Sequence, residues 1–210
     1  MVRQPNGVLP IRIALLGAPQ VRSADGTHIF ALPRKTLDVL AYIILQRHRT
    51  MARASVAFAL FPDDEEELAR NSLRRNLSYL LSSLPAAPAS TPFIQTDGKT
   101  IAWNVRAPAT IDLDEFEHSI AGGRDAAAIA IYTGELLPTL YADWTMAERE
   151  RLRALFHDAL LRELQRLRSS RRFDEAAMVA RSLLNDDPWR EDVVRLLMAV
   201  LHEAGDRAVR

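Results

Sequence analysis

The sequence predicts a mainly α fold with small antiparallel sheets, divided into two domains. Its 210 residues exceed the roughly 150 residues that one domain usually takes. Strand-like and helical segments mix in the first half of the chain, whereas only helical periodicities follow residue 110. We therefore expect a mixed first domain over residues 1–107 and an all-α second domain over residues 108–210.

The first domain begins with three short strand-like runs, over residues 11–17, 20–22 and 27–32, the last two on either side of the turn dipeptide Asp25-Gly26. Pro33 suits the first turn of a helix. Three helices are predicted next, from Arg34 onward, over 54–60 and over 68–84. Two further strand-like runs around Asp97-Gly98 predict a hairpin over residues 93–104. Strand, three helices and hairpin is the element order of a winged helix-turn-helix domain.

The second domain is predicted to contain helices over residues 112–121, 124–132, 145–169, 173–186 and 189–204. Phe173, Ala176 and Pro188 match positions of the tetratricopeptide repeat pattern. A second repeat would end after its first helix. Because such a repeat buries its apolar face against the next helix, we expect the polypeptide to continue beyond Arg210.

Two groups of side chains in the second domain have a structural interpretation. We expect the large aromatic residues to pack in the core; these are Tyr132, Tyr141, Trp144, Phe156 and Trp189. The arginines of the long helix stand among acidic residues and predict an ion-paired surface; these are Arg149, Arg151, Arg153, Arg162, Arg166 and Arg168.

The composition is that of an ordinary water-soluble chain, with 48% hydrophobic and 26% charged residues. The absence of cysteine excludes disulfides and cysteine-based catalytic or zinc sites. No apolar run approaches 18 residues and no segment resembles a signal peptide, so we expect no membrane span and a cytoplasmic location. The net charge of zero averages 12 Lys/Arg and 8 Asp/Glu in residues 1–104 with 15 and 19 in residues 105–210. This asymmetry favours a polyanion-binding module joined to a module that contacts protein.

The third predicted helix has two different faces. At 100° per residue, one face should pack in the core; it holds Ala69, Leu73, Leu77, Leu80, Leu81 and Leu84. The opposite face holds Asn71, Arg74, Arg75, Ser78 and Ser82. These side chains carry the donors that read the major groove of DNA, since Arg pairs with guanine, Asn with adenine, and Ser reaches a base or a phosphate. The alternative is a solvated helix face.

Further charged residues are candidates for contacts around that helix. Basic side chains that could bind phosphates are Arg34, Lys35, Arg49, Arg53 and Lys99; each alone could equally be a plain surface charge. Acidic residues precede the helix, where they also complement its dipole; these are Asp63, Asp64, Glu65 and Glu66.

Enzymatic functions lack the necessary parts. The sequence has no phosphate-binding glycine loop and no dinucleotide-binding fingerprint. Its five histidines stand without the spacing of metal ligands. We assign no catalytic residue, no metal site and no cofactor.

Several motifs resemble one bacterial family. The segments LPRK at 32–35, LAYI at 40–43, LFPD at 60–63 and ARNSLRRNLS at 69–78 resemble the DNA-binding part of SARP-type regulators, whose winged helix is similar to the OmpR-type effector domain. Trp144 with Glu148 and Arg149, and the segments IDLDEF at 111–116, YTGELLP at 132–138 and DPWRE at 187–191, resemble the bacterial transcriptional activator domain that follows it.

The resemblance implies a transcription regulator, an activator that binds double-stranded DNA at direct repeats as a homodimer. It also implies that Asp63, Asp64, Glu65 and Glu66 contact RNA polymerase holoenzyme. After Ser78 the chain has Tyr79, Leu81 and Ser82 where family members often carry Arg or Lys. This departure supports an alternative, a protein-interaction or signalling module of a larger protein, whose winged helix does not read sequence.

Overall fold

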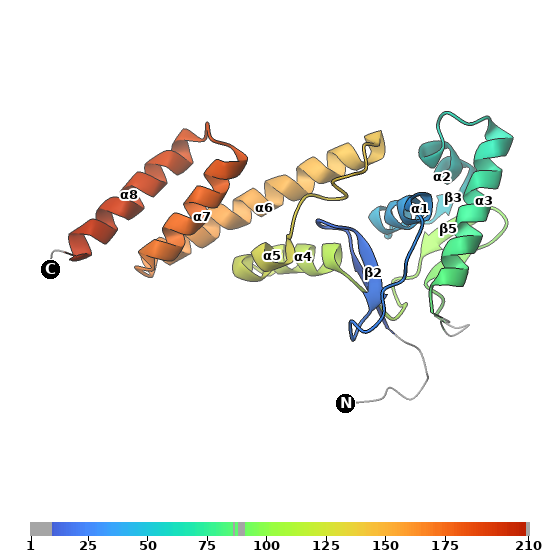
Figure 1. Cartoon of the computed structure of the whole chain (residues 1–210), viewed down its shortest axis with the longest axis horizontal. Coiled ribbons are helices and arrows are strands. Elements are labelled where there is room, and N and C mark those ends of the chain that lie inside the picture. Colours follow the sequence, from blue (N-terminus) through green and yellow to red (C-terminus); the bar gives the residue numbers. More distant parts are fainter. Residues whose placement is uncertain (1–9, 86, 88–90, 209–210) are drawn as a thin grey trace. The chain divides into compact units, whose positions relative to one another are not determined.

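The computed structural model describes residues 10–85, 87 and 91–208. The chain divides into two units, Met1–Asp112 and Leu113–Arg210 (Figure 1). The first unit therefore extends five residues past the boundary expected at residue 107. Residues 1–9, where a signal peptide would begin, lie outside the described part. Within that part, no helix has the length and apolar character needed to cross a bilayer.

The first unit mixes short strands with three helices, as the sequence predicted. In chain order the elements are β1 (Ile11–Ala14), β2 (Gln20–Ser23), α1 (Arg34–Leu45), β3 (Met51–Ala52), α2 (Arg53–Leu60), α3 (Glu66–Ser83), β4 (Ile94–Thr96), β5 (Thr100–Trp103) and β6 (Ala109–Ile111). The strands form two sheets, in the orders β2-β1-β6 and β3-β5-β4. This is the winged helix-turn-helix arrangement, with β4 and β5 as the wing.

The sheets differ from the prediction in two ways. The pairing of β6 with β1 is parallel, whereas only antiparallel sheets were expected. The predicted strand over residues 27–32 is also wrong, because that segment contributes a single bridge between Arg22 and Ile29. The side chain of Asp25 explains the irregular course there, since it accepts hydrogen bonds from the Ser23 and Thr27 hydroxyls and from the Thr27 amide.

Helix α1 forms the centre of the first unit. Its residues Val39, Leu40, Ile43 and Ile44 are completely buried, and it packs against α3 and β5. The end of the unit is held by Asp112, whose carboxylate accepts hydrogen bonds from the amides of Leu15 (2.7 Å) and Leu16 (2.8 Å). Residues almost a hundred positions apart therefore close the β2-β1-β6 sheet.

The second unit consists of helices joined by loops over its described residues. Its helices are α4 (Asp112–Ala121, which begins at the last residue of the first unit), α5 (Asp125–Ile131), α6 (Asp143–Ser169), α7 (Phe173–Asp186) and α8 (Glu191–Ala208). Consecutive helices pack against each other from α5 to α8, as expected for a tetratricopeptide-like stack. One core cluster joins α6, α7 and α8 through Leu160, Leu164, Ala180, Leu183 and Val193.

The aromatic residues of this unit behave in two ways. Tyr132 stacks on Phe156 with 4.1 Å between ring centroids and also contacts Phe116, in keeping with the expected core role. The expectation was wrong for Tyr141 and Trp189, which are 86% and 90% exposed. Trp189 lies between α7 and α8, where its amide is bonded to the Asp187 side chain while its ring remains in solvent.

The arginines of α6 are ion-paired as expected, with one informative exception. Five of them pair with Asp or Glu side chains, namely Arg151, Arg153, Arg162, Arg166 and Arg168. Arg149 instead donates hydrogen bonds to the carbonyls of Leu136, Leu137 and Leu140. It thereby holds the loop before α6, in which Leu137 has a positive φ of 47°.

Candidate nucleic-acid interface

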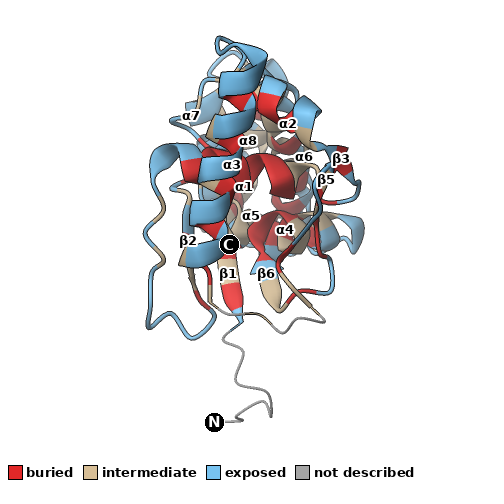
Figure 2. Ribbon diagram, turned by 90° about the vertical axis from the view of Figure 1, so that its right-hand side faces the viewer, coloured by how far each residue is buried: buried red, intermediate tan, exposed pale blue. Residues whose placement is uncertain are grey.

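Helix α3 is fixed to the first unit by one face and leaves the opposite face open. Glu66 and Glu67 in its first turn complement the helix dipole. Ala69, Leu73, Leu77 and Leu80 are buried and pack α3 against α1 and α2. Figure 2 shows the alternation of buried and exposed residues along the helix. The helix is therefore a firm support for whatever its outer face presents.

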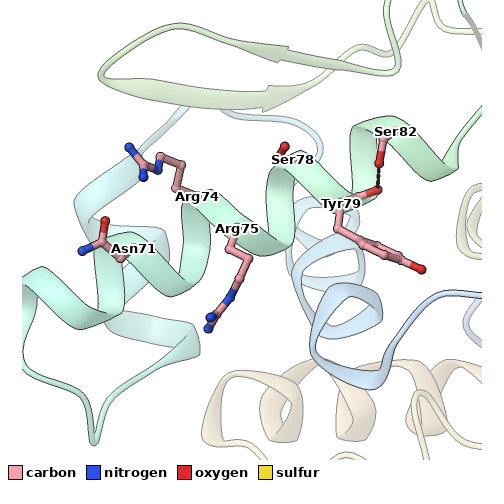
Figure 3. Close-up of a pocket in the computed structure, with 6 residues that line it drawn as sticks. All are labelled: Asn71, Arg74, Arg75, Ser78, Tyr79 and Ser82. Carbon is pink, nitrogen blue, oxygen red and sulfur yellow. Dashed lines mark hydrogen bonds between the residues drawn. The ribbon is translucent and has the colours of Figure 1, made fainter.

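The outer face carries the side chains predicted for it. Five side chains form what we call the donor stripe: Asn71, Arg74, Arg75, Ser78 and Ser82. All five are exposed, and together with Tyr79 they line a shallow depression (Figure 3). In the described part of the chain neither Arg74 nor Arg75 forms an ion pair. Both guanidinium groups are consequently available to an external anion or base.

The members of the donor stripe point to different sides of the helix. Arg74 and Ser78 lie on one side of α3, whereas Arg75 and Tyr79 lie on the other (Figure 3). The Ser82 hydroxyl donates a hydrogen bond of 2.9 Å to the carbonyl of Tyr79. Its proton is thus used within the helix, and only the acceptor capacity of this hydroxyl remains for a partner.

The sequence prediction of the helix faces was wrong for one residue. Leu81 was assigned to the core, but it is 43% exposed. At 100° per residue it lies about 85° from the centre of the buried face formed by Ala69, Leu73, Leu77 and Leu80, so it falls at the boundary between the two faces. Tyr79, on the opposite flank, is 46% exposed. The outer face therefore has apolar side chains at both edges of its C-terminal half.

A second groove joins α3 to the β4–β5 hairpin. Polar and basic side chains from three elements line it. These are Arg70, Asn71 and Arg74 of α3, Arg53 of α2 and Lys99 at the hairpin tip. Sequence reasoning missed Arg70, although its position four residues before Arg74, on the same side of α3, was a usable signal. The groove is basic, since among the described residues Arg70 is the one cation of this groove that is neutralised, by an ion pair with Glu66.

The hairpin tip has an ordered conformation that presents Lys99. The Asp97 carboxylate accepts hydrogen bonds from the amides of Lys99 and Thr100, and these bonds hold the pKa of Asp97 below its usual range. Arg53 donates to the Thr96 hydroxyl and to the Asp97 carbonyl, both at 3.2 Å. Arg53 therefore ties the wing to α2, with its charge beside the exposed Lys99.

The remaining predicted cations lie apart from this groove. Lys35 is 3.7 Å from the Asp38 carboxylate and 5.6 Å from the centroid of the Phe61 ring. Arg34 precedes it at the start of α1, and Arg49 is exposed in the connection between α1 and β3. The structure thus brings Arg53 and Lys99 to the donor stripe, whereas Arg34, Lys35 and Arg49 do not line the same groove.

The acidic residues before α3 are all exposed. Asp63 and Asp64 lie in the turn after α2, Glu65 occupies the N-cap position of α3 without a side-chain capping bond, and Glu66 is the first residue of the helix. Asp64 is 3.5 Å from the Ser72 hydroxyl, at the limit of a hydrogen bond. The structural role expected for helix-start acids is thus compatible with the geometry, and these side chains remain open to a partner.

The site has the chemistry of recognition. Among the described residues no group of three or more His, Cys, Asp or Glu side chains is placed to hold a metal ion. The donor stripe offers guanidinium, amide and hydroxyl groups on a rigid helix, which is the set that binds base edges and phosphates.

Two comparisons with known proteins found a similarity, one in sequence and one in fold. Residues 111–209 match the family model of the bacterial transcriptional activator domain. Among solved structures, the fold is similar to that of Mycobacterium tuberculosis EmbR in complex with a low-affinity phosphopeptide, with a TM-score of 0.70 and 21% identity. The match covers 96% of this chain and 57% of the EmbR chain, so the chain spans little more than half the length of that protein. A search of curated proteins found no match.

Proposed function

We propose that this chain is a SARP-type transcriptional regulator. Its first unit binds double-stranded DNA sequence-specifically in the bacterial cytoplasm. In this proposal α3 enters the major groove and the β4–β5 hairpin contacts the flanking backbone. The single observation that carries the proposal is the donor stripe itself. Its five polar side chains are exposed on the face opposite the buried leucines, with the basic hairpin tip beside them.

Each member of the donor stripe has a role that follows from its chemistry. Arg74 and Arg75 have free guanidinium groups that can pair with a guanine edge, and Asn71 can pair with adenine. Ser78 can donate or accept at a base or a phosphate. Because the Ser82 hydroxyl already donates its proton to the Tyr79 carbonyl, we expect Ser82 to contribute least to DNA binding.

The phosphate contacts are assigned to the basic residues around the stripe. Lys99 and Arg53 lie nearest to it, and Arg34, Lys35 and Arg49 are the further candidates. With about four to six phosphates neutralised, the logarithm of the binding constant should fall with the logarithm of the salt concentration with a slope near −4 to −5.

Two further contacts complete the proposal. A homodimer on direct repeats would place two copies of α3 about one helical turn of DNA apart, roughly 10–11 base pairs. The acidic residues Asp63, Asp64, Glu65 and Glu66, which all remain exposed, would meet a basic surface of RNA polymerase holoenzyme.

The experiment that tests the proposal starts from a random DNA pool. The full chain is used to select bound sequences, and its affinity for a selected duplex and for a scrambled duplex is then measured by fluorescence anisotropy. Arg75→Ala should cost about 1–3 kcal/mol on the selected duplex and less on the scrambled one. Arg195→Ala is the matched control, since it removes the same charge from an exposed site on α8.

Two results would contradict the proposal at different levels. An equal loss on both duplexes would reassign Arg75 to a phosphate contact. Failure of the selection to enrich any sequence would favour the alternative of a protein-interaction module, which the exposed apolar side chains Tyr79 and Leu81 support.

A further inference from the structure

A cleft separate from the donor stripe lies between α2 and the beginning of α3. It has a volume of about 580 Å³. Ala54, Ala57 and Ala69 contribute small apolar side chains to it, and Phe58 and Phe61 contribute two aromatic rings. The small side chains leave room beside the rings, so the cleft has the size for one large apolar side chain from outside.

Phe58 is the most informative residue of this cleft. It is 75% exposed, although it lies on a short helix whose neighbouring residues Val56, Ala57 and Leu60 are buried. Since α2 packs in the core through those three residues, Phe58 is directed outward by the helical repeat. An aromatic ring held in solvent on a fixed helix is typical of the anchor positions at protein interfaces.

The charges around the cleft are almost all negative. Asp64, Glu66 and one cation, Arg70, line it. Asp63, Glu65 and Glu67 are exposed in the same acidic run. In the described part of the chain the one ion pair of this run joins Glu66 to Arg70. Lys35 reaches the Phe61 ring from α1, where it also faces Asp38. The run therefore keeps a negative charge of about four that nothing in the described chain offsets.

This charge decides which kind of partner the cleft can accept. Carboxylates repel the phosphates of nucleic acids, so the cleft is unsuitable as part of the DNA contact. A protein segment with Lys or Arg side chains would be attracted by the carboxylates. Its cations could also lie over the face of Phe58.

We propose that the cleft formed by Ala54, Ala57, Phe58, Phe61 and Ala69 docks a basic protein segment that inserts one large apolar side chain against Phe58. This inference rests on the proposed polymerase contact and deepens it. The acidic run attracts the partner, and the apolar contact with Phe58 adds to the binding affinity. The carboxylates select the partner and the cleft holds it.

The test measures two affinities of the full chain separately. Purified bacterial RNA polymerase holoenzyme is the probe, and its binding is measured without DNA by biolayer interferometry. DNA binding is measured with the selected duplex. Phe58→Ala should weaken holoenzyme binding about tenfold or more, with DNA affinity unchanged. Phe58→Leu, which retains an apolar side chain, should restore a large part of the binding.

The matched control is Val105→Ala, which truncates another exposed apolar side chain of the first unit, 70% exposed. It should change neither affinity. Unchanged thermal unfolding of the Phe58 variants confirms that their fold is intact. A second variant, Asp64→Lys, should weaken holoenzyme binding and reduce its dependence on salt.

The outcomes separate this inference from the proposed function. Equal holoenzyme affinity of Phe58→Ala and wild type would overturn the docking cleft and leave DNA binding untouched. A wild-type chain that does not bind holoenzyme would overturn the docking cleft together with the polymerase contact. A chain that binds holoenzyme through Phe58 but enriches no DNA sequence would support the cleft and contradict the DNA-binding proposal.

Discussion

Asp38 is an ionisable residue on the buried face of α1. It is 7% exposed, and burial raises the pKa of its carboxyl, while the nearby charges of Lys35 and Arg34 act in the opposite direction. A carboxyl whose pKa is higher in the folded than in the unfolded chain costs stability where it is ionised, that is, at pH values above its folded pKa. The cost disappears as the pH falls toward the unfolded value.

The first prediction follows from the raised pKa of Asp38. Asp38→Asn should raise the thermal unfolding midpoint at pH 7, and its advantage over wild type should shrink as the pH is lowered toward 4. Thermal unfolding followed by circular dichroism over this pH series checks it. Asp63→Asn, which removes an exposed carboxylate, is the control and should show little change. A wild type more stable than Asp38→Asn at pH 7 would mean that the Lys35 ion pair outweighs desolvation.

Single residues also show where the chain fixes its loops with side chains. Arg149 donates to three carbonyls of the preceding loop, and the Asp97 carboxylate accepts from two amides of the wing. Arg149 was grouped with the ion-paired arginines of α6 because charge spacing on a helix identifies such pairs. Nothing in that spacing distinguishes a guanidinium that turns toward a preceding loop, since its acceptors are backbone atoms present at every residue.

At the scale of the element, α3 divides its surface between core and solvent, and Leu81 lies at the dividing line. Because Leu81 is 43% exposed, Leu81→Arg should fold normally and add one cation beside the donor stripe. We expect tighter binding to random DNA and a salt slope steeper by about 0.9, the effect of one more phosphate contact. Anisotropy titrations between 50 and 200 mM salt, roughly the range in which this dependence is usually measured, check this.

Two comparisons make the Leu81 experiment decisive. Leu81→Gln removes the apolar side chain without adding charge and should leave the salt slope unchanged. Leu77→Arg, at a position only 3% exposed, should unfold the first unit. If Leu81→Arg were destabilised like Leu77→Arg, the leucine would belong to the core, as the sequence alone suggested.

The helices could be predicted from sequence because their periodicity extends over many residues. The ranges 112–121 and 173–186 agree with α4 and α7, and all five residues of the donor stripe were found from the wheel of one helix. The short strands were not predictable in this way. β3 has two residues and β6 three, which is too short for an alternation to appear, and both are defined by partners far along the chain.

The same limit applies to the site. The basic residues Arg34, Lys35 and Arg49 were grouped with Arg53 and Lys99 by charge alone, whereas the groove beside α3 contains only the last two of these. Phe58 carried no signal, because an apolar residue in a short helix is normally buried. Only the packing of α2 shows which of its apolar side chains is left outside.

At the scale of the whole molecule, the transition between the two units is defined by residues that belong to the first. β6 pairs with β1, and Ile111 is 3% exposed. Asp112 then accepts the amides of Leu15 and Leu16. The sequence placed the boundary at residue 107 on the strength of Pro108 and the change in periodicity. Pro108 is compatible with a boundary at residue 107 and also with a short edge strand that follows it and belongs to the first unit.

The last prediction compares two fragments that end on either side of β6. A fragment of residues 1–112 keeps β6 and the Asp112 carboxylate, whereas a fragment of residues 1–107 leaves β1 without its parallel partner and the Leu15 and Leu16 amides without their acceptor. A hydrogen bond to a charged group contributes about 1.5–3 kcal/mol, and the loss of the buried Ile111 side chain adds a cost of similar size. The longer fragment should therefore unfold at clearly higher urea concentration, as followed by Trp103 fluorescence. Equal midpoints for the two fragments would show that the first unit is complete without β6.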